Sequence, residues 1–366
     1  MKFELYKIDG KFDGKTCYVH ARACALDENK MVMTTQKLNV RGDDSFGGLE
    51  TLKSYDGGKT WTEPCFDPGL APVEHEDGTT RLWCDATHLL HKKTGVPILI
   101  GPEVGYKPTS VYQVRLPKRA LCYSTYDIEK ECYTTWRRLE LPEELNERFK
   151  RGLAPGCSQF MEDDNGDVLI PVMADEGGPS TELVIRCGFD GTTLTYKSIS
   201  NELYFNVRDG IGEGSLVKLN GRYYLTIRNY DHGIWSVSDD GEHFTQPTVW
   251  RWDTGLDLPT YNTQSHLLKC GGKLYLVYTR RAGNNDHVFR NRAPLFMAEV
   301  NTENMTVLHT TERIVIPERG ARLGNFDVTQ FDDDHAMIIA AEWMQPVSCT
   351  RYGSDNTIWL CDVRAD

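Results

Sequence analysis

Hydrophobic and polar positions along the chain repeat as one unit, made of an apolar strand, a polar turn with Gly or Asp, and a second apolar strand. The unit recurs with a spacing of roughly 60 residues, and no helical period lies between its strands. Its six copies open near Val19, Asp85, Pro155, Gly212, Asn262 and Gly324. The second strands are expected at residues 31–35, 96–100, 168–173, 223–227, 274–278 and 336–341. This repetition predicts an all-β fold, a six-bladed β-propeller.

The remaining apolar segments fit the outer part of each blade. Third strands are expected at residues 49–54, 120–124, 183–187, 233–237, 295–300 and 357–363. The last of these ends the chain, whereas the apolar segment 3–8 has no blade of its own. We therefore expect the N-terminal strand to pair with the last blade and close the ring, which removes an exposed sheet edge. A short helix is expected within residues 142–150, and residues 1–366 are interpreted as one domain.

One turn carries a specific sequence pattern. Residues 54–61, Ser-Tyr-Asp-Gly-Gly-Lys-Thr-Trp, match S-x-D-x-G-x-T-W, the Asp box, and residues 238–244 carry a shortened version. Asp56 is expected to hydrogen-bond its own backbone, Gly58 to adopt a positive φ, and Trp61 to pack between blades. The motif is a folding device between the third and fourth strands, so we expect it at the blade periphery and outside any catalytic site.

Composition narrows the class of partner. The net charge is −12 and the pI is near 5.4, which argues against nucleic acid or an anionic membrane as partner. The sequence shows no apolar run of signal-peptide or membrane-span length, so a cytoplasmic location is expected for the form given, and a secreted or periplasmic one if a signal was removed. The eleven cysteines include no C-x-x-C pair, and no cofactor or metal motif is seen.

Three arginines and a glutamate fall at corresponding places in the repeat. Arg22 lies in the first inner strand, Glu213 and Arg228 stand 15 residues apart in the fourth blade, and Arg292 precedes the third strand of the fifth blade. With the Asp box, these positions resemble the sialidase (neuraminidase) superfamily over essentially the whole chain. The usual Ile-Pro after the first arginine is Ala-Cys here.

The resemblance implies roles for these residues. It implies that the three arginines hold a substrate carboxylate, which planar guanidinium groups bind in a bidentate manner. It implies that Glu213 assists a tyrosine nucleophile, and that an acid/base aspartate lies in the first-blade loop, where Asp43 and Asp44 are the candidates. The expected partner is therefore an acidic oligosaccharide or glycoconjugate.

The nucleophile is where the sequence departs from the family. Counting back from Glu342, the position that the resemblance assigns to the tyrosine holds Phe326, and no tyrosine occurs between Tyr278 and Tyr352. A phenyl ring cannot attack an anomeric carbon. Tyr352, in the turn after the second strand of the sixth blade, is a poor substitute for it.

Two other chemistries stay open. Water activated by a carboxylate or a histidine could attack directly, as in an inverting hydrolase, or a His/Tyr pair could abstract a proton beside a carboxylate, as in a lyase acting on uronate-containing polysaccharides. The inner-strand candidates for these tasks are His20, His88, His266 and Asp327. Polar residues alternate at Asn262, Gln264 and His266, which points them toward the axis. The leading hypothesis is a sialidase-like glycoside hydrolase; the alternatives are the lyase and a non-catalytic glycan-binding propeller.

Overall fold

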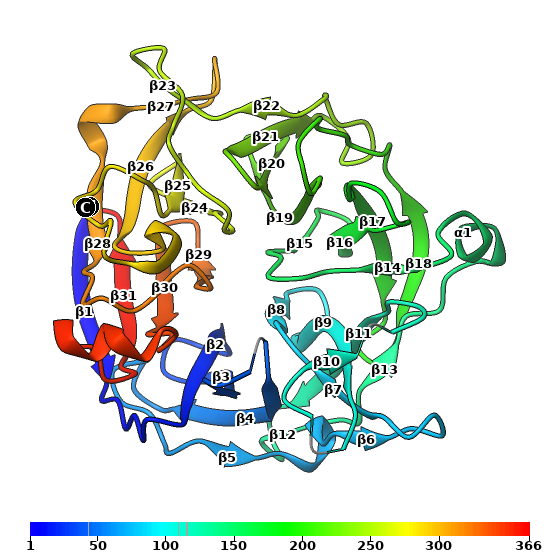
Figure 1. Ribbon diagram of the computed structural model, residues 1–366. Helices are drawn as coiled ribbons and strands as arrows, with labels where there is room; N and C mark the ends of the chain where they lie inside the picture. The colour runs from blue at the N-terminus through cyan, green and yellow to red at the C-terminus, as the bar shows by residue number, and fades with distance from the viewer. Residues whose placement is uncertain (43, 109, 115) are drawn as a thin grey trace.

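The computed structural model of the protein describes residues 1–42, 44–108, 110–114 and 116–366. Within these residues the strands form six sheets arranged around a central axis (Figure 1). Five of the sheets are propeller blades, and the sixth has eight strands and is curled. The prediction of an all-β propeller is confirmed, while the second repeat departs from a plain four-stranded blade.

The blades are largely antiparallel, and in the first, third and fourth blades the strands follow one another from the axis outward. The first blade contains β2 (Thr16–Ala25), β3 (Met31–Asn39), β4 (Phe46–Ser54) and β5 (Cys65–Phe66). The third contains β14 (Leu153–Ala154), β15 (Met161–Glu162), β16 (Asp167–Ala174), β17 (Thr181–Phe189) and β18 (Leu194–Ile199). The fourth contains β19 (Ile211–Leu219), β20 (Arg222–Asn229), β21 (Gly233–Ser238) and β22 (Thr248–Val249). The fifth contains β23 (Arg251–Trp252), β24 (His266–Cys270), β25 (Lys273–Tyr278), β26 (Leu295–Asn301), β27 (Thr306–Val307) and β28 (Arg313–Ile316).

The curled sheet owes its shape to one long strand, β9 (Val96–Tyr106). Its first half pairs with β8 (Thr87–His91) and β11 (Leu121–Asp127), and its second half pairs with β7 (Thr80–Trp83) and β10 (Gln113–Val114). The shorter strands β6 (Val73–Glu74), β12 (Cys132–Tyr133) and β13 (Arg137–Arg138) complete the sheet. The helix α1 (Glu143–Arg148) follows in the connection to the third blade, as the sequence predicts.

The ring closes between the two ends of the chain. The last blade contains β29 (Asp327–Asp332), β30 (His335–Ala341) and β31 (Ile358–Arg364), and β1 (Lys2–Ile8) is its outer strand. All seven residues of β1 pair with β31 in antiparallel register, from Lys2 opposite Arg364 to Ile8 opposite Ile358. Figure 1 shows the blue β1 beside the red β31. The predicted closure by the N-terminal strand is confirmed.

The Asp-box turn has the expected construction. Oδ1 of Asp56 accepts hydrogen bonds from the backbone of Lys59 and Thr60, and Ser54 Oγ donates to the same carboxylate at 2.9 Å. Gly58 has φ of +88°, and a Cβ there would lie 2.9 Å from the thioether atoms of Met31 and Met337. These methionines come from the first and last blades, so the turn sits at the seam where the ring closes.

Apolar clusters fill the spaces between neighbouring sheets. Between the last blade and the first, for example, Ala21 and Met33 belong to the same buried cluster as Met337 and Leu360. Four short 3₁₀ segments, η1 (Pro68–Leu70), η2 (Phe289–Asn291), η3 (His309–Thr311) and η4 (Val347–Tyr352), lie in connections. Within the part of the chain that the structure describes, no helix has the length and apolar character needed to cross a membrane.

Candidate active site

Five sheets present a non-glycine residue with left-handed backbone where their first strand opens. These residues are His20, Asp85, Cys157, Glu213 and Asn262, with φ between 43° and 56°. At His20 and Glu213 the pairing with the second strand shifts register, as in a β-bulge. The left-handed conformation costs an L-residue about 1–2 kcal/mol. Strain repeated at matching places of a fold is typical of a functional site.

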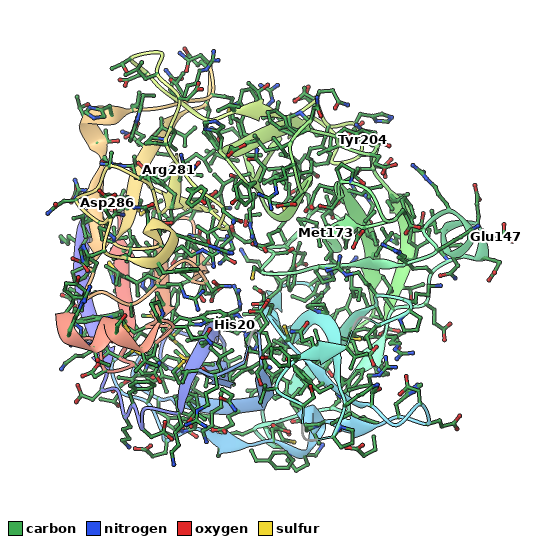
Figure 2. All side chains as sticks on the ribbon, viewed as in Figure 1. His20, Glu147, Met173, Tyr204, Arg281 and Asp286 are labelled. Carbon is green, nitrogen blue, oxygen red and sulfur yellow. The ribbon has the colours of Figure 1, made fainter. Side chains whose placement is uncertain are left out.

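Four of these five residues, His20, Asp85, Cys157 and Glu213, line a cavity of about 850 Å³. This volume is within the size range of ligand pockets. Further lining residues come from all six sheets or their connections, so the cavity lies at the axis of the ring. In Figure 2, His20 and Met173 lie toward the middle of the ring, whereas Glu147 lies at its outer edge.

One wall of the cavity is formed by three arginines, Arg228, Arg292 and Arg322. Arg228 forms an ion pair with Glu213 and donates to Oδ1 of Asn262 at 2.6 Å. Arg292 donates to the backbone carbonyl of Asn262. Arg322 donates to the side chain of Gln345 at 3.0 Å. Three guanidinium groups from the fourth, fifth and sixth blades therefore line one cavity.

Within this wall, the guanidinium of Arg292 has few partners among the described residues. Arg292 is buried, and no group in the described ranges accepts a hydrogen bond from its Nε. Burial, followed by the positive charges of Arg228 and Arg322, lowers the pKa of Arg292. A guanidinium keeps its proton in proteins, so Arg292 stays charged in a place that disfavours its charge. An anion bound beside these arginines would relieve that cost.

The cavity also holds a histidine–carboxylate pair, His20 and Asp85. Nε2 of His20 lies 2.7 Å from Oδ1 of Asp85, and His20 Nδ1 lies 3.2 Å from Gln36 Oε1. The imidazole also packs against Phe46 and Trp343, with ring centroids 4.9 and 5.4 Å away. Both ring nitrogens thus have a partner, and the ring is held in place at the cavity surface.

Glu213 lies on a β-bulge, and a second glutamate, Glu182, hydrogen-bonds to the backbone of this bulge. Oε1 of Glu182 accepts a hydrogen bond of 2.9 Å from the backbone N–H of Gly214, and a Cβ at Gly214 would lie 2.3 Å from that oxygen. Glu182 is fully buried, and burial raises its pKa to about 8. Glu182 is therefore protonated at neutral pH, and it holds the turn that carries Glu213 without competing for Arg228.

The structure brings together only part of the predicted set. Glu213, Arg228, Arg292, His20 and Asp44 line the larger cavity, and Asn262 lines a smaller one beside it. Asp44 is exposed on the first-blade loop. Asp43 lies outside the described residues.

The other predicted residues are buried and line neither cavity: Arg22, Gln264, His266 and Asp327. Arg22 Nη2 lies 3.6 Å from Asp85 and Nη1 donates to the carbonyl of Phe326 at 3.0 Å. His266 is hydrogen-bonded to Ser215, and burial, followed by the charge of Arg22, lowers its pKa to about 3. Asp327 accepts from the backbone of Ala23 and from Thr329.

The position expected for the nucleophile is occupied by a packed phenyl ring. Phe326 is fully buried and meets His266 edge to face at 4.8 Å, and the preceding Asn325 lines the cavity instead. Glu342 is buried in a bidentate ion pair with Arg319. Among the described residues, no tyrosine lines the larger cavity.

Sequence reasoning missed several cavity residues, of which Asp85, Cys157 and Arg322 are the most prominent. The sequence did contain a signal for Asp85, because this residue lies at the start of its repeat, as Glu213 and Asn262 do in theirs. Arg322 carried no such signal. Among the described residues no group of histidine, cysteine, aspartate and glutamate side chains is arranged to hold a metal ion.

The comparisons with known proteins concern the fold. No family model and no curated protein matches the sequence. A Dyadobacter fermentans protein of unknown function is 16% identical, with 99% of this chain and 98% of that chain covered and a TM-score of 0.67. A sialidase of Trypanosoma rangeli is 16% identical, with 98% of this chain covered and a TM-score of 0.61, and the match spans 59% of the sialidase. NanB sialidase of Streptococcus pneumoniae is 13% identical, with 99% and 70% covered and a TM-score of 0.64. At these identities the likeness shows that the protein has the propeller fold found in sialidases.

Proposed function

We propose that the protein is a sialidase-like glycoside hydrolase that acts on an acidic glycan, with the curled sheet standing as the second blade of a six-bladed ring. The observation that carries the proposal is the wall of three arginines, Arg228, Arg292 and Arg322, in a protein whose net charge is −12. One of the sialidase structures that share the fold contains sialic acid, a carboxylate sugar.

The arginine wall would bind the carboxylate of the sugar. Arg292 offers a buried Nε–H for which the described residues supply no acceptor, and Arg228 and Arg322 add positive charge on either side. Charge-assisted hydrogen bonds to a carboxylate are among the strongest that proteins make. Arg322 would be the third arginine that binds the carboxylate. The resemblance assigned this role to Arg22, but Arg22 is fully buried beside Asp85.

Hydrolysis in this cavity would use water as the nucleophile. Asp85, held by its contact with His20, would take a proton from a water molecule whose oxygen bonds to the anomeric carbon. The glycosidic C–O bond breaks as Asp44 donates a proton to the leaving oxygen. Glu213, paired with Arg228, would place negative charge near the anomeric carbon as positive charge develops there. Direct attack by water inverts the anomeric configuration.

A second candidate is a lyase for uronate-containing glycans, and the His20–Asp85 pair favours it. The carboxylate of Asp85 could abstract the proton beside a substrate carboxylate that the arginines have neutralised, and elimination would leave an unsaturated sugar. His266, the residue considered for this role from the sequence, is buried away from both cavities.

One experiment separates these functions. The purified protein is incubated with sialosides and with uronate-rich glycans, and released sugar and near-ultraviolet absorbance are followed together. A hydrolase releases free acidic sugar as its inverted anomer, and a lyase gives absorbance without free sugar. Arg292→Ala should abolish either signal, whereas Arg251→Ala, at an exposed ion pair with Asp257, should change neither. Saturable binding without turnover would identify a glycan-binding propeller.

A further inference from the structure

One glutamine of the larger cavity, Gln345, bonds to two separate parts of its lining. It follows β30 in the last blade and is half-buried. Its Oε1 accepts hydrogen bonds of 3.0 Å from Nη2 of Arg322 and from Nε1 of Trp343. Its Nε2 donates at 2.8 Å to the backbone carbonyls of Val40 and Gly42, in the loop between β3 and β4. The last blade therefore connects the arginine wall to the first-blade loop through one side chain.

These four bonds use the full hydrogen-bonding capacity of the amide. A carboxamide oxygen has two lone pairs, and its nitrogen carries two protons. At Gln345, two N–H donors face the oxygen and two carbonyls face the nitrogen, so the partners fix the orientation of the amide. A glutamate of the same length would place an oxygen against the two carbonyls, and a methionine would bond to neither side. The position therefore requires the chemistry of glutamine as well as its size.

On the side of the arginine wall, Gln345 orients a guanidinium that aromatic rings hold in place. The Arg322 guanidinium lies 4.5 Å from the ring centroid of Trp343 and 5.2 Å from that of Phe289. A cation–π contact attracts the guanidinium to a ring, but a hydrogen bond also sets the direction of an N–H group. Gln345 therefore helps to determine how Arg322 faces the cavity.

On the other side, Gln345 and the curled sheet hold the first-blade loop from two directions. The carbonyl of Asp44 accepts hydrogen bonds from Oη of Tyr106 in β9 and, at 3.1 Å, from Nε2 of Gln113 in β10. Asp44 has a left-handed φ of 47°, a conformation that a non-glycine residue keeps where its surroundings enforce it. The bonds from Gln345 hold the carbonyls of residues 40 and 42 in the same loop. The placement of Asp44 thus depends on both sets of contacts.

We infer that Gln345 is a positioning residue that couples carboxylate binding by Arg322 to proton donation by Asp44. This inference rests on the proposed function, in which Arg322 binds the carboxylate and Asp44 protonates the leaving oxygen. The carboxylate and the leaving oxygen belong to the same sugar, so the two protein groups must be held at a matching separation. Gln345 sets that separation because it bonds to Arg322 and to the loop of Asp44. An amide neither gives nor takes a proton at neutral pH, so Gln345 acts through its neighbours.

Proton donation to the leaving group gives this inference a specific signature. A poor leaving group such as methanol needs a proton as the C–O bond breaks, whereas nitrophenol leaves readily as its anion. If Gln345 positions Asp44, its loss should slow hydrolysis of a methyl glycoside far more than hydrolysis of a nitrophenyl glycoside. A residue that only stabilised the fold would lower both rates by the same factor.

Two substitutions at this position test the signature. Gln345→Met keeps the length of the side chain and removes all four hydrogen bonds, while Gln345→Glu keeps the acceptor for Arg322 and removes the donors to the loop. The matched control is Gln246→Met, because Gln246 is exposed, also precedes a proline, and lies between β21 and β22 in the fourth blade. Thermal melts of each variant establish that it is folded.

The measurement is kcat/KM on the methyl and 4-nitrophenyl glycosides of N-acetylneuraminic acid and of glucuronic acid. For the acid that is hydrolysed, the ratio of methyl to nitrophenyl kcat/KM should fall by roughly 10-fold or more in both Gln345 variants. In Gln246→Met the ratio should stay within about twofold of wild type. Asp44→Asn should lower the ratio as well, and adding Gln345→Met to Asp44→Asn should lower it no further, because the two residues act as a unit.

The outcomes separate the two proposals. An unchanged ratio in both Gln345 variants, or a further fall when Gln345→Met is added to Asp44→Asn, would overturn the inference and leave the proposed function standing. An unchanged ratio in Asp44→Asn would remove Asp44 as the acid and overturn the inference with it. Hydrolysis of none of the four glycosides by the wild type would overturn the proposed function, and with it the inference that depends on it.

Discussion

His20 and Asp85 open the first two repeats of the ring, and their side chains meet in the cavity with 2.7 Å between Nε2 and Oδ1. Burial acts to raise the pKa of Asp85, but His20 and Arg22 outweigh it and lower the pKa below its ordinary value. Asp85 is therefore ionised, orients the imidazole at the cavity surface, and also compensates the buried Arg22. Two residues 65 positions apart thus become one functional pair through the repeat.

If Asp85 is the base, Asp85→Asn should lower kcat by roughly 10²- to 10⁴-fold on the substrate found in the release assay. Asparagine can still hydrogen-bond with His20 but cannot take a proton. The matched control is Asp257→Asn, at an exposed ion pair with Arg251. A kcat within threefold of wild type in Asp85→Asn would remove Asp85 from the mechanism.

The left-handed residues predict an unusual order of stability. Cys157 is buried with φ of 48°, so Cys157→Gly should unfold at a higher urea concentration than Cys157→Ala. Both changes remove the thiol, but only glycine adopts this backbone without strain, and the difference should be about 1 kcal/mol. Urea denaturation of the two variants measures it. An alanine variant as stable as the glycine variant would show that the position is not strained.

Glu182 predicts a specific dependence of stability on pH. Its pKa rises from 4.5 to about 8 on folding, so the folded state holds a proton that the unfolded state has lost. The contribution of Glu182 is complete below the unfolded pKa and is lost as pH rises through about 8, by up to about 1.4 kcal/mol per pH unit. Relative to Glu182→Gln, the wild type should therefore lose stability between pH 5 and 8. A difference in stability between the wild type and Glu182→Gln that stays the same at every pH would contradict the burial of a neutral carboxylic acid at position 182.

Phe326→Tyr should fail to restore a tyrosine nucleophile. The ring is fully buried against His266, so the added hydroxyl enters packed protein rather than the cavity. We expect no gain in activity and a loss of stability of about 1–3 kcal/mol, from overpacking and an unsatisfied hydroxyl. Activity assays and thermal melts of the variant check both parts. Gain of a retaining sialidase activity would show that position 326 reaches the substrate.

The sequence predicted the ring because its repeat is made of adjacent strands. Strand alternation and turn residues are local, so β2–β3 and the five later pairs could be recognised without knowing how they pack. Closure by β1 followed from counting strands, since the last blade lacked an outer one. The curl of the second sheet did not follow, because it depends on β9 changing partners along its length.

The site was predicted less well, for a physical reason. Side chains alternate along a strand with a period of two, but the bulge at His20 inserts a residue and changes the phase. His20 consequently lines the cavity, and Arg22 is buried behind it. Arg322 escaped notice because it lies in a connection rather than in a repeated strand. Its place in the cavity comes from tertiary structure alone.

The central claim is that the arginine wall binds a carboxylate, and the most direct test compares an acidic sugar with its own ester. The methyl glycosides of N-acetylneuraminic acid and glucuronic acid are titrated into the wild type beside the same glycosides esterified at the carboxyl group. Esterification removes the charge and keeps the remaining contacts, so the account predicts that the bound acid loses roughly 100-fold in affinity, about 2.7 kcal/mol. Equal affinity of an acid and its ester would contradict the carboxylate site around Arg292.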